Sequence, residues 1–338
     1  MKTLKFLTAL LITTMCFNCD TDDDAISNTQ PPLPATSINL EFDLTTNQDQ
    51  MGDFANKAMT VFNGHVWAFG GSDDYVTEGD STNQLWNSSN GVNWASVNTN
   101  STLSPLGRHG LTLTSFNGKM YLIGGEDNDH NILSDIWETS DGINWTNTLA
   151  TAPFGQVAGH STIVFNGNMY VIGINYTTGN TKIWSTTNGS NWTEENSNAF
   201  PALKRYKTVV LNNAMYVIGS EKITGVMSNE IWRSTNGSTW TLISQSSSNP
   251  LPALRRHTAT IYNNKAFVIG GLTTSGTQTN NIYYSEDMET WNLYTDTNPL
   301  EAIDSHCSLI YNSELWVFGG SRPGSLGRTG KIWRIMEF

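Results

Sequence analysis

The amino-acid sequence predicts an all-β protein, a six-bladed β-propeller, from one feature that recurs along the chain. A short apolar run that ends in a glycine step occurs six times, and the residues after the first glycine lie at positions 71, 125, 174, 220, 271 and 320. Successive positions are 54, 49, 46, 51 and 49 residues apart. A period of about 50 residues in strand-rich units is typical of propellers, because a four-stranded sheet buries both faces only against neighbouring sheets.

Each repeat predicts four strands in the same order. The first strand ends in an aromatic residue or Leu, and a two-residue turn such as Asn63-Gly64 or Asn312-Ser313 follows it. Asn and Gly tolerate the positive φ of a tight hairpin turn. The second strand is the apolar run, whose lack of polar alternation predicts burial on both faces. A third strand follows a variable loop, and a fourth follows a second turn.

Tryptophan placement supports packing between blades. Ten of the twelve tryptophans fall at two repeat positions, in the third and fourth strands: Trp86, Trp137, Trp184, Trp232 and Trp333, and Trp94, Trp145, Trp192, Trp240 and Trp291. Large aromatic side chains dominate core energetics. We therefore expect them to form the blade cores and not a platform for sugars.

The two ends of the repeat region complement each other. The sixth repeat stops at Phe338, after its third strand, whereas Ile38–Leu44 alternates apolar and polar residues like a spare strand. We expect this N-terminal strand to complete the last blade and remove an open edge. The predicted propeller domain is 37–338.

The start of the chain predicts export. Residues 1–18 have the pattern of a lipoprotein signal peptide, with Lys2 and Lys5 before a short apolar stretch. Cys19 stands directly before the acidic run of residues 20–24, which resembles surface-exported lipoproteins of the Bacteroidetes type. The resemblance implies a lipid on Cys19.

A lipid at this position implies a location for the domain. Residues 19–36, polar and proline-bearing, are expected to be a disordered tether that holds the domain at the outer membrane or cell surface. Cys16 is the alternative lipidation site, and a plain secretory signal is the alternative interpretation of the whole segment. Cys307 is then the other thiol of the mature chain, and its strand context predicts a buried small side chain and not a nucleophile.

The net charge of the chain limits the kinds of partner that it can bind. The formal net charge is -12, which argues against nucleic acid, because phosphate binding needs a Lys/Arg surface. The lipid anchor is the only membrane attachment that we expect. We expect a monomer without a metal or cofactor.

The hairpin, the Gly-Gly step and the third-strand aromatic together resemble Kelch repeats from about residue 50 onward. In the third and fourth repeats Ile174 and Ser220 replace the second glycine. A second resemblance lies in the turns before the fourth-strand tryptophan, such as Thr139–Trp145 and Thr186–Trp192, which are similar to the Asp-box of sialidases. That resemblance implies a structural hairpin away from the active site.

Propeller topology predicts where a ligand binds. The starts of the first strands should ring the mouth of the central channel, and the residues expected to bind a ligand there are Arg108, His109, His160, Arg205, Tyr206, Arg256, His257 and His306. Such a ring suits an anionic sugar or an acidic peptide, through charge-assisted hydrogen bonds. The structural alternative is that an Arg-His start belongs to the Kelch pattern and serves packing.

Two functions remain after these steps. The leading hypothesis is a non-catalytic, surface-anchored binding module that recognises a glycan or a protein at the channel mouth. The alternative is an enzyme acting on acidic sugars, because Kelch propellers include a sialic-acid mutarotase. That resemblance implies a proton shuttle of Glu221 with Arg205.

Two other sugar-related activities fit the sequence less well. Sialidases use three arginines, the first near the chain start, whereas this chain has no arginine before Arg108. A galactose-oxidase-like copper site needs a Cys crosslinked to Tyr in a seven-bladed domain, and Cys307 lies inside a predicted strand.

Overall fold

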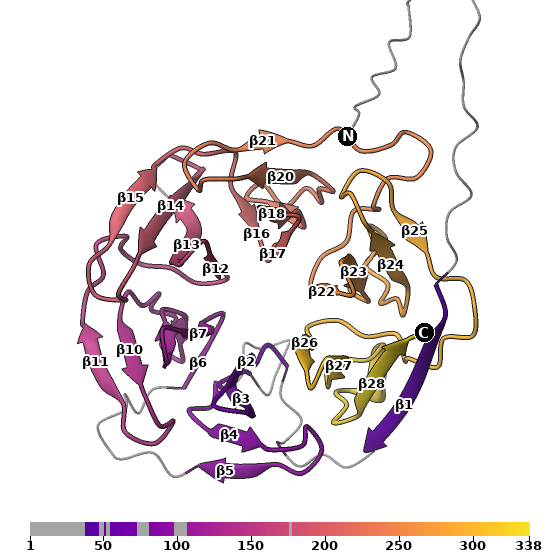
Figure 1. The fold of residues 1–338 in the computed structure, drawn as a ribbon, viewed down its shortest axis with the longest axis horizontal. Helices are drawn as coiled ribbons and strands as arrows, with labels where there is room; N and C mark the ends of the chain where they lie inside the picture. The colour runs from indigo at the N-terminus through magenta and orange to yellow at the C-terminus, as the bar shows by residue number, and fades with distance from the viewer. Residues whose placement is uncertain (1–37, 47–50, 52–54, 73–80, 98–106, 176–177) are drawn as a thin grey trace, which may run out of the picture. The chain divides into compact units, whose positions relative to one another are not determined.

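The computed structural model describes residues 38–46, 51, 55–72, 81–97, 107–175 and 178–338. Within the unit Ser37–Phe338, six four-stranded antiparallel sheets are arranged as blades around a common axis (Figure 1). Two short two-stranded sheets and one 3₁₀ turn, η1 (Gly324–Leu326), accompany them. The predicted six-bladed propeller is confirmed. No helix in the described part of the chain is long and apolar enough to span a bilayer.

The first three blades run in chain order from the inner strand outward. Blade 1 is β2 (Ala58–Phe62), β3 (His65–Phe69), β4 (Leu85–Ser88) and β5 (Ala95–Val97). Blade 2 is β7 (Thr112–Phe116), β8 (Lys119–Ile123), β10 (Ile136–Thr139) and β11 (Thr146–Leu149). Blade 3 is β12 (Ser161–Phe165), β13 (Asn168–Asn175), β14 (Asn180–Thr186) and β15 (Thr193–Asn196).

Blades 4 and 5 repeat this order, and the last blade departs from it. Blade 4 is β17 (Lys207–Leu211), β18 (Ala214–Ile218), β20 (Ile231–Ser234) and β21 (Thr241–Leu242). Blade 5 is β22 (Thr258–Tyr262), β23 (Lys265–Ile269), β24 (Ile282–Ser285) and β25 (Asn292–Leu293). Blade 6 is β26 (Cys307–Tyr311), β27 (Glu314–Phe318), β28 (Ile332–Glu337) and β1 (Leu40–Thr46). The short sheets pair β6 (Arg108–His109) with β9 (Glu126–Asp127), and β16 (Leu203–Lys204) with β19 (Glu221–Lys222).

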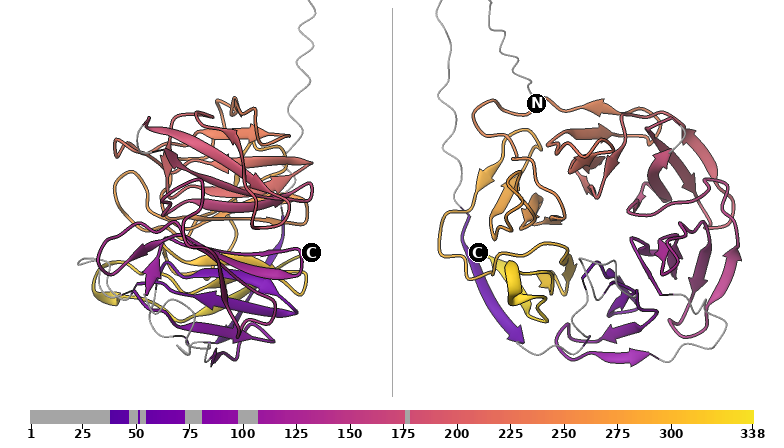
Figure 2. Two further views of the ribbon diagram at one scale, coloured as in Figure 1. Left: turned by 90° about the vertical axis from the view of Figure 1, so that its left-hand side faces the viewer. Right: turned by 180° about the vertical axis from the view of Figure 1, so that it is seen from behind.

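The N-terminal strand closes the ring, as predicted. β1 pairs antiparallel with β28, with Leu40 opposite Glu337 and Phe42 opposite Ile335, and both views of the ring place it at the outer edge (Figures 1 and 2). The strand lies two residues further along than the predicted Ile38–Leu44. This pairing covers the edge of the last blade, so that every blade has four strands.

The inner hairpins follow the turn chemistry of the sequence. Both residues of each turn between first and second strands have positive φ, for example 48° at Asn63 and 74° at Gly64. A primed turn with this geometry matches the twist of the two strands it joins. The six predicted hairpins are therefore present, including the Asn312-Ser313 turn without glycine.

Glycine steps are needed because two chain segments touch there. A Cβ on Gly71 would lie 2.7 Å from the carbonyl oxygen of Ala55, and one on Gly271 would lie 2.8 Å from that of Arg255. Each second glycine thus lets the loop after the second strand pass close to the segment before the first. In blade 3, where Ile174 replaces this glycine, β13 continues to Asn175.

The hydrophobic core is divided among the interfaces between blades. One cluster joins Phe62 and Phe69 of blade 1 to Met120, Leu122 and Trp145 of blade 2, all buried. The repeated tryptophans pack in such clusters, as predicted, and are buried or half-buried.

Candidate functional site

A ring of six residues with left-handed backbone marks one face of the propeller. Each lies two residues before the first residue of the inner strand of its blade, and we call them the mouth ring: Asn56, Gly110, Gly159, Arg205, Arg256 and Ser305. Their φ angles lie between 55° and 64°. Left-handed backbone is costly for a large non-glycine side chain such as Arg. Strain of this kind persists where surrounding structure enforces it, and it concentrates at functional sites.

Backbone hydrogen bonds connect members of the mouth ring across blade boundaries. The amide of Gly159 donates to the carbonyl of Gly110 at 2.7 Å, and that of Ser305 donates to Arg256 at 3.0 Å. The amide of Asn56 donates to Ser305 at 3.1 Å and so joins the first blade to the last. The ring holds the starts of the inner strands, and the side chains there, in fixed positions.

A pocket of about 380 Å³ opens at the mouth ring, and we call it the channel pocket. All six blades contribute to it, and its lining includes every member of the mouth ring. Six of the eight predicted ligand-binding residues line it: His109, His160, Arg205, Tyr206, Arg256 and His306. The predicted convergence of the first-strand starts on the channel mouth is thereby observed. The ligand-binding role of these residues remains a prediction.

The lining of the channel pocket is strongly cationic. It contains five lysines and arginines and one carboxylate: Lys57, Lys204, Arg205, Lys207 and Arg256, with Glu126. The whole chain has 18 Lys and Arg against 30 Asp and Glu. More than a quarter of the basic residues therefore gather in one pocket of an acidic protein. A concave surface lined by positive charge concentrates the electrostatic potential in the pocket and attracts anions to it.

Two arginines of the mouth ring lie beside carboxylates behind the pocket. Arg205 Nη1 lies 3.4 Å from Glu221 Oε2, and Arg255 Nη1 lies 3.6 Å from the same oxygen. Arg256 Nη1 lies 3.9 Å from Asp304 Oδ1. The side chain of Arg205 remains about half exposed, with 47% of its surface accessible. These contacts orient the arginines and leave Arg205 open to a ligand.

Two of the histidines that line the pocket, His160 and His306, are neutral and make structural contacts. Burial lowers the pKa of His160 and of His306 to about 3. His160 Nε2 lies 3.1 Å from Thr112 Oγ1, and His306 Nε2 lies 2.9 Å from Thr258 Oγ1. Both bonds join neighbouring blades. These imidazoles offer a polar wall to the pocket and no positive charge.

Two predicted residues do not line the pocket. Arg108 is 2% exposed and donates two hydrogen bonds to the carboxylate of Asp135, at 2.7 and 3.1 Å. His257 is 1% exposed, and burial lowers its pKa to about 3. Their positions support packing roles. Tyr206 lines the pocket, but its hydroxyl donates to the carbonyl of Ile172.

Comparisons with known proteins agree with this architecture. The profile described as the KLHDC2/KLHL20/DRC7 Kelch-repeats domain matches residues 56–271, more than half of the chain. The chain belongs to this Kelch-repeat family. A solved structure described as "Structure of YjhT" is similar in fold to the chain. Its TM-score is 0.65 at 14% identity, and the match covers 86% of this chain and 99% of that one. No curated protein matches the sequence.

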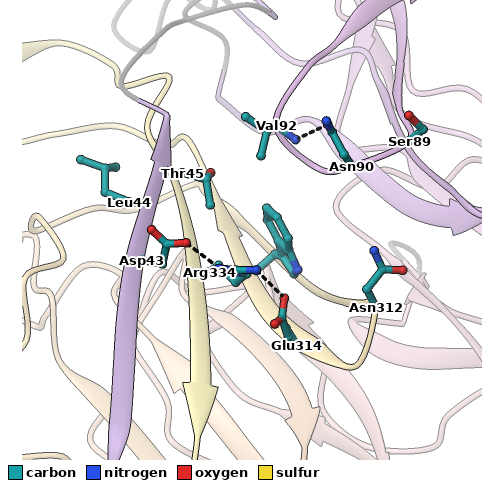
Figure 3. A pocket seen from close by; sticks show the side chains of 10 residues that line it. Asp43, Leu44, Thr45, Ser89, Asn90, Val92, Asn312, Glu314 and Arg334 are labelled. Carbon is teal, nitrogen blue, oxygen red and sulfur yellow. Dashed lines mark hydrogen bonds and ion pairs between the residues drawn. The ribbon is translucent and has the colours of Figure 1, made fainter.

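A second pocket of this Kelch domain, of about 540 Å³, opens on the opposite face; we call it the seam pocket. It lies where β1, β27 and β28 of the last blade meet the turn after β4 of the first. Arg334 stands between Asp43 at 2.7 Å and Glu314 at 3.4 Å (Figure 3). Arg334 is the one arginine among the described residues that line the seam pocket, and two carboxylates pair with it. The seam pocket therefore has no excess of positive charge. The expectation from the Asp-box resemblance, that these turns lie away from the functional site, stays a prediction.

Sequence reasoning missed three aspects of the channel pocket. Lys204 and Lys207 flank the predicted Arg205-Tyr206 pair and both line it. Cys307 was expected to be a buried strand residue, whereas it is half-buried in the pocket wall and its thiol donates to the carbonyl of Lys57 at 3.0 Å. Aligning the Kelch repeats on their hairpin turns would have placed all three beside the mouth ring, because each lies within two residues of a ring member.

Proposed function

We propose that this Kelch domain is a non-catalytic binding module whose channel pocket recognises an acidic group of a glycan or protein ligand. The observation that carries the proposal is the gathering of five cationic side chains and one carboxylate in one concave pocket. Pockets of roughly 300–1,000 Å³ suit small ligands or the end group of a larger one. At about 380 Å³, the channel pocket has room for one sugar residue or one acidic side chain.

The mouth ring supplies the specific contacts in this proposal. Arg205 and Arg256 hold their side chains at the pocket from strained backbone positions, and Arg205 is half exposed. A guanidinium binds a carboxylate or sulfate through paired, charge-assisted hydrogen bonds. Lys204 adds a further cation beside them. A neutral ligand would form only weaker hydrogen bonds with these cations, because its acceptor atoms carry no charge.

The enzymatic alternative, a sialic-acid mutarotase-like activity, would use Glu221 and Arg205. Glu221 does not line the channel pocket, and one of its carboxylate oxygens already lies close to Arg205 and Arg255. A proton shuttle needs a carboxylate within hydrogen-bond reach of the substrate. Both contacts would have to open first, so we rank this function below binding. Mutarotation of sialic acid, followed by NMR with wild type and Glu221→Gln, decides it.

Binding of residues 37–338 to arrays of acidic and neutral glycans, and of acidic peptides, tests the proposal. We expect acidic ligands to bind and neutral analogues not to bind. Arg205→Ala and Arg256→Ala should each weaken binding by about 1.5–3 kcal/mol, the usual scale for hydrogen bonds to charged groups. Lys119→Ala is the matched control, since Lys119 lies at the other end of its blade and pairs with Glu138. Equal losses in all three variants would contradict the proposal.

We further propose that the domain is displayed on the cell surface by a lipid on Cys19. This segment lies outside the described residues, and the acidic run after Cys19 supports the proposal. Mass spectrometry of the membrane-extracted protein should find an acylated cysteine at the mature N-terminus. A Cys19→Ala protein that still carries the lipid would show that Cys16 is the site.

A further inference from the structure

The first residues of the six inner strands form a layer directly beyond the mouth ring. Five of them are small, and one is a lysine: Ala58, Thr112, Ser161, Thr258 and Cys307, with Lys207. Neighbouring inner strands contact one another around the propeller, so these six residues occupy equivalent positions in their blades. Lys207 is the only long and the only charged side chain at this level, and it lines the channel pocket.

The titratable groups that interact electrostatically with Lys207 belong to other blades and carry no negative charge. It acts electrostatically on His257 of blade 5 and on His306 and Cys307 of blade 6. Burial lowers the pKa of both histidines to about 3, so that they are neutral. Burial raises the pKa of the Cys307 thiol, which stays protonated and donates a hydrogen bond to the carbonyl of Lys57. The thiol is therefore not a counter-ion.

Apart from the Cys307 thiol, which is protonated, no described residue is placed to act as a counter-ion to the Lys207 ammonium. The two mouth-ring arginines differ, because Arg205 and Arg256 lie beside Glu221 and Asp304. Lys207 is half-buried, and partial removal of an ammonium from water without a partner is costly. Burial accordingly lowers the pKa of Lys207. An anion next to the ammonium would offset that cost.

We propose that Lys207 forms an inner anion subsite of the channel, one layer beyond Arg205 and Arg256, which takes a second acidic group of the ligand. The ligand class is then a compound with two acidic groups, carboxylate, sulfate or phosphate. One group engages the mouth ring, and the other reaches Lys207. This inference rests on the proposed function, because both acidic groups enter through the channel pocket.

Adipate and hexanoate are matched probes for this subsite, since they have equal length and differ by one carboxylate. Their dissociation constants are measured by NMR titration of the protein with ¹³C-methylated lysines. We expect adipate to bind at least tenfold more tightly than hexanoate and to shift the Lys207 resonance. Lys207→Met, which keeps the length of the side chain and removes its charge, should abolish the preference. Lys119→Met should retain it.

The outcomes separate the inner subsite from the mouth ring. If hexanoate binds as tightly as adipate and both depend on Arg205, the mouth-ring site stands and the inner subsite is wrong. If neither probe binds and the Lys207 resonance does not move, both proposals are wrong. If Lys207→Met fails to fold, two measurements replace it. Lys207→Gln should also lose the preference for adipate, and adipate should shift the Lys207 resonance of the wild type. An adipate preference that survives loss of the Lys207 charge also overturns the inference.

Discussion

The guanidinium of Arg205 lies 3.4 Å from the carboxylate of Glu221, behind the pocket that Arg205 lines. The two residues belong to one blade and are held by the short β16–β19 sheet, in which Lys204 pairs with Glu221. Glu221 thus positions an arginine at the mouth of the channel, in a backbone conformation that arginine rarely adopts. Through this contact, the folded blade holds one of the positive charges of the channel pocket in place.

The left-handed backbone of Arg205 predicts how substitutions there affect stability. Arg205→Gly and Arg205→Ala both lose the exposed contact with Glu221, which contributes at most about 1 kcal/mol. Only glycine relieves the backbone strain, which costs roughly 1–2 kcal/mol for other residues. We expect the Gly variant to be about 1 kcal/mol more stable than the Ala variant in urea unfolding. Equal stabilities would show that the ring geometry is not strained.

Buried histidines predict a loss of stability in acid. The pKa values of His160, His257 and His306 are about 3 in the folded state, against an ordinary value of 6.5. Between pH 6.5 and 3 the unfolded chain binds protons that the folded chain does not. The free energy of unfolding should therefore fall as the pH drops below about 6.5. Each histidine contributes up to about 1.4 kcal/mol per pH unit.

Unfolding curves between about pH 8 and pH 4 measure this slope. His306→Gln should make it shallower, because this variant lacks one of the three buried imidazoles. A slope that is the same in His306→Gln and wild type would contradict burial of a neutral imidazole.

Closure of the ring predicts unequal effects at two neighbouring residues of β1. Leu40 is buried in the cluster shared by blades 5 and 6, and Glu41 is exposed. Leu40→Ala should lower the free energy of unfolding by about 2–3 kcal/mol, the lower part of the range for buried leucines. Glu41→Ala should change it by less than about 0.5 kcal/mol. Similar small effects of both would argue against the closing role of β1.

The glycine of the turn before the fourth strand has a packing role that a matched pair of variants isolates. A Cβ on Gly189 would lie 2.4 Å from the ring of Tyr121 in the preceding blade, whereas one on Gly167 would meet nothing within 4 Å. Their φ angles, 78° and 76°, are nearly equal. Gly189→Ala should therefore cost about 1–3 kcal/mol more than Gly167→Ala in thermal unfolding. Equal costs would mean that backbone strain alone accounts for glycine at this turn.

The parts of the fold that depend on local chemistry were predictable from the sequence. The hairpin turns depend on two adjacent residues such as Asn63 and Gly64, and the period follows from their repetition. The closing strand was predictable because a missing strand at one end matched a spare one at the other. Its predicted start is two residues early, since Ile38 continues the alternation but lies outside β1.

Contacts between distant residues limited the prediction of the site. Arg108 precedes a first strand, which predicts a place in the ring, but its partner Asp135 lies 27 residues away and holds it in the interior. The seam pocket needs β1 beside β28 and was invisible in the repeat pattern. Asn56, Gly110 and Gly159 are residue types that tolerate positive φ, so they partly predicted the left-handed backbone of the mouth ring. Arg205 and Arg256 rarely adopt positive φ, and nothing in the sequence indicated it at their positions.

Anomalous diffraction from crystals soaked in selenate tests the central claim, that the channel mouth is an anion-binding pocket, most directly. Selenate is an oxyanion that can be located without reference to any natural ligand. We predict a selenium peak in the channel pocket within contact distance of Arg205, Arg256 or Lys207, and its loss in the Arg205→Ala, Arg256→Ala double variant. A channel pocket without selenate, with peaks at Arg334 of the seam pocket instead, would contradict the account.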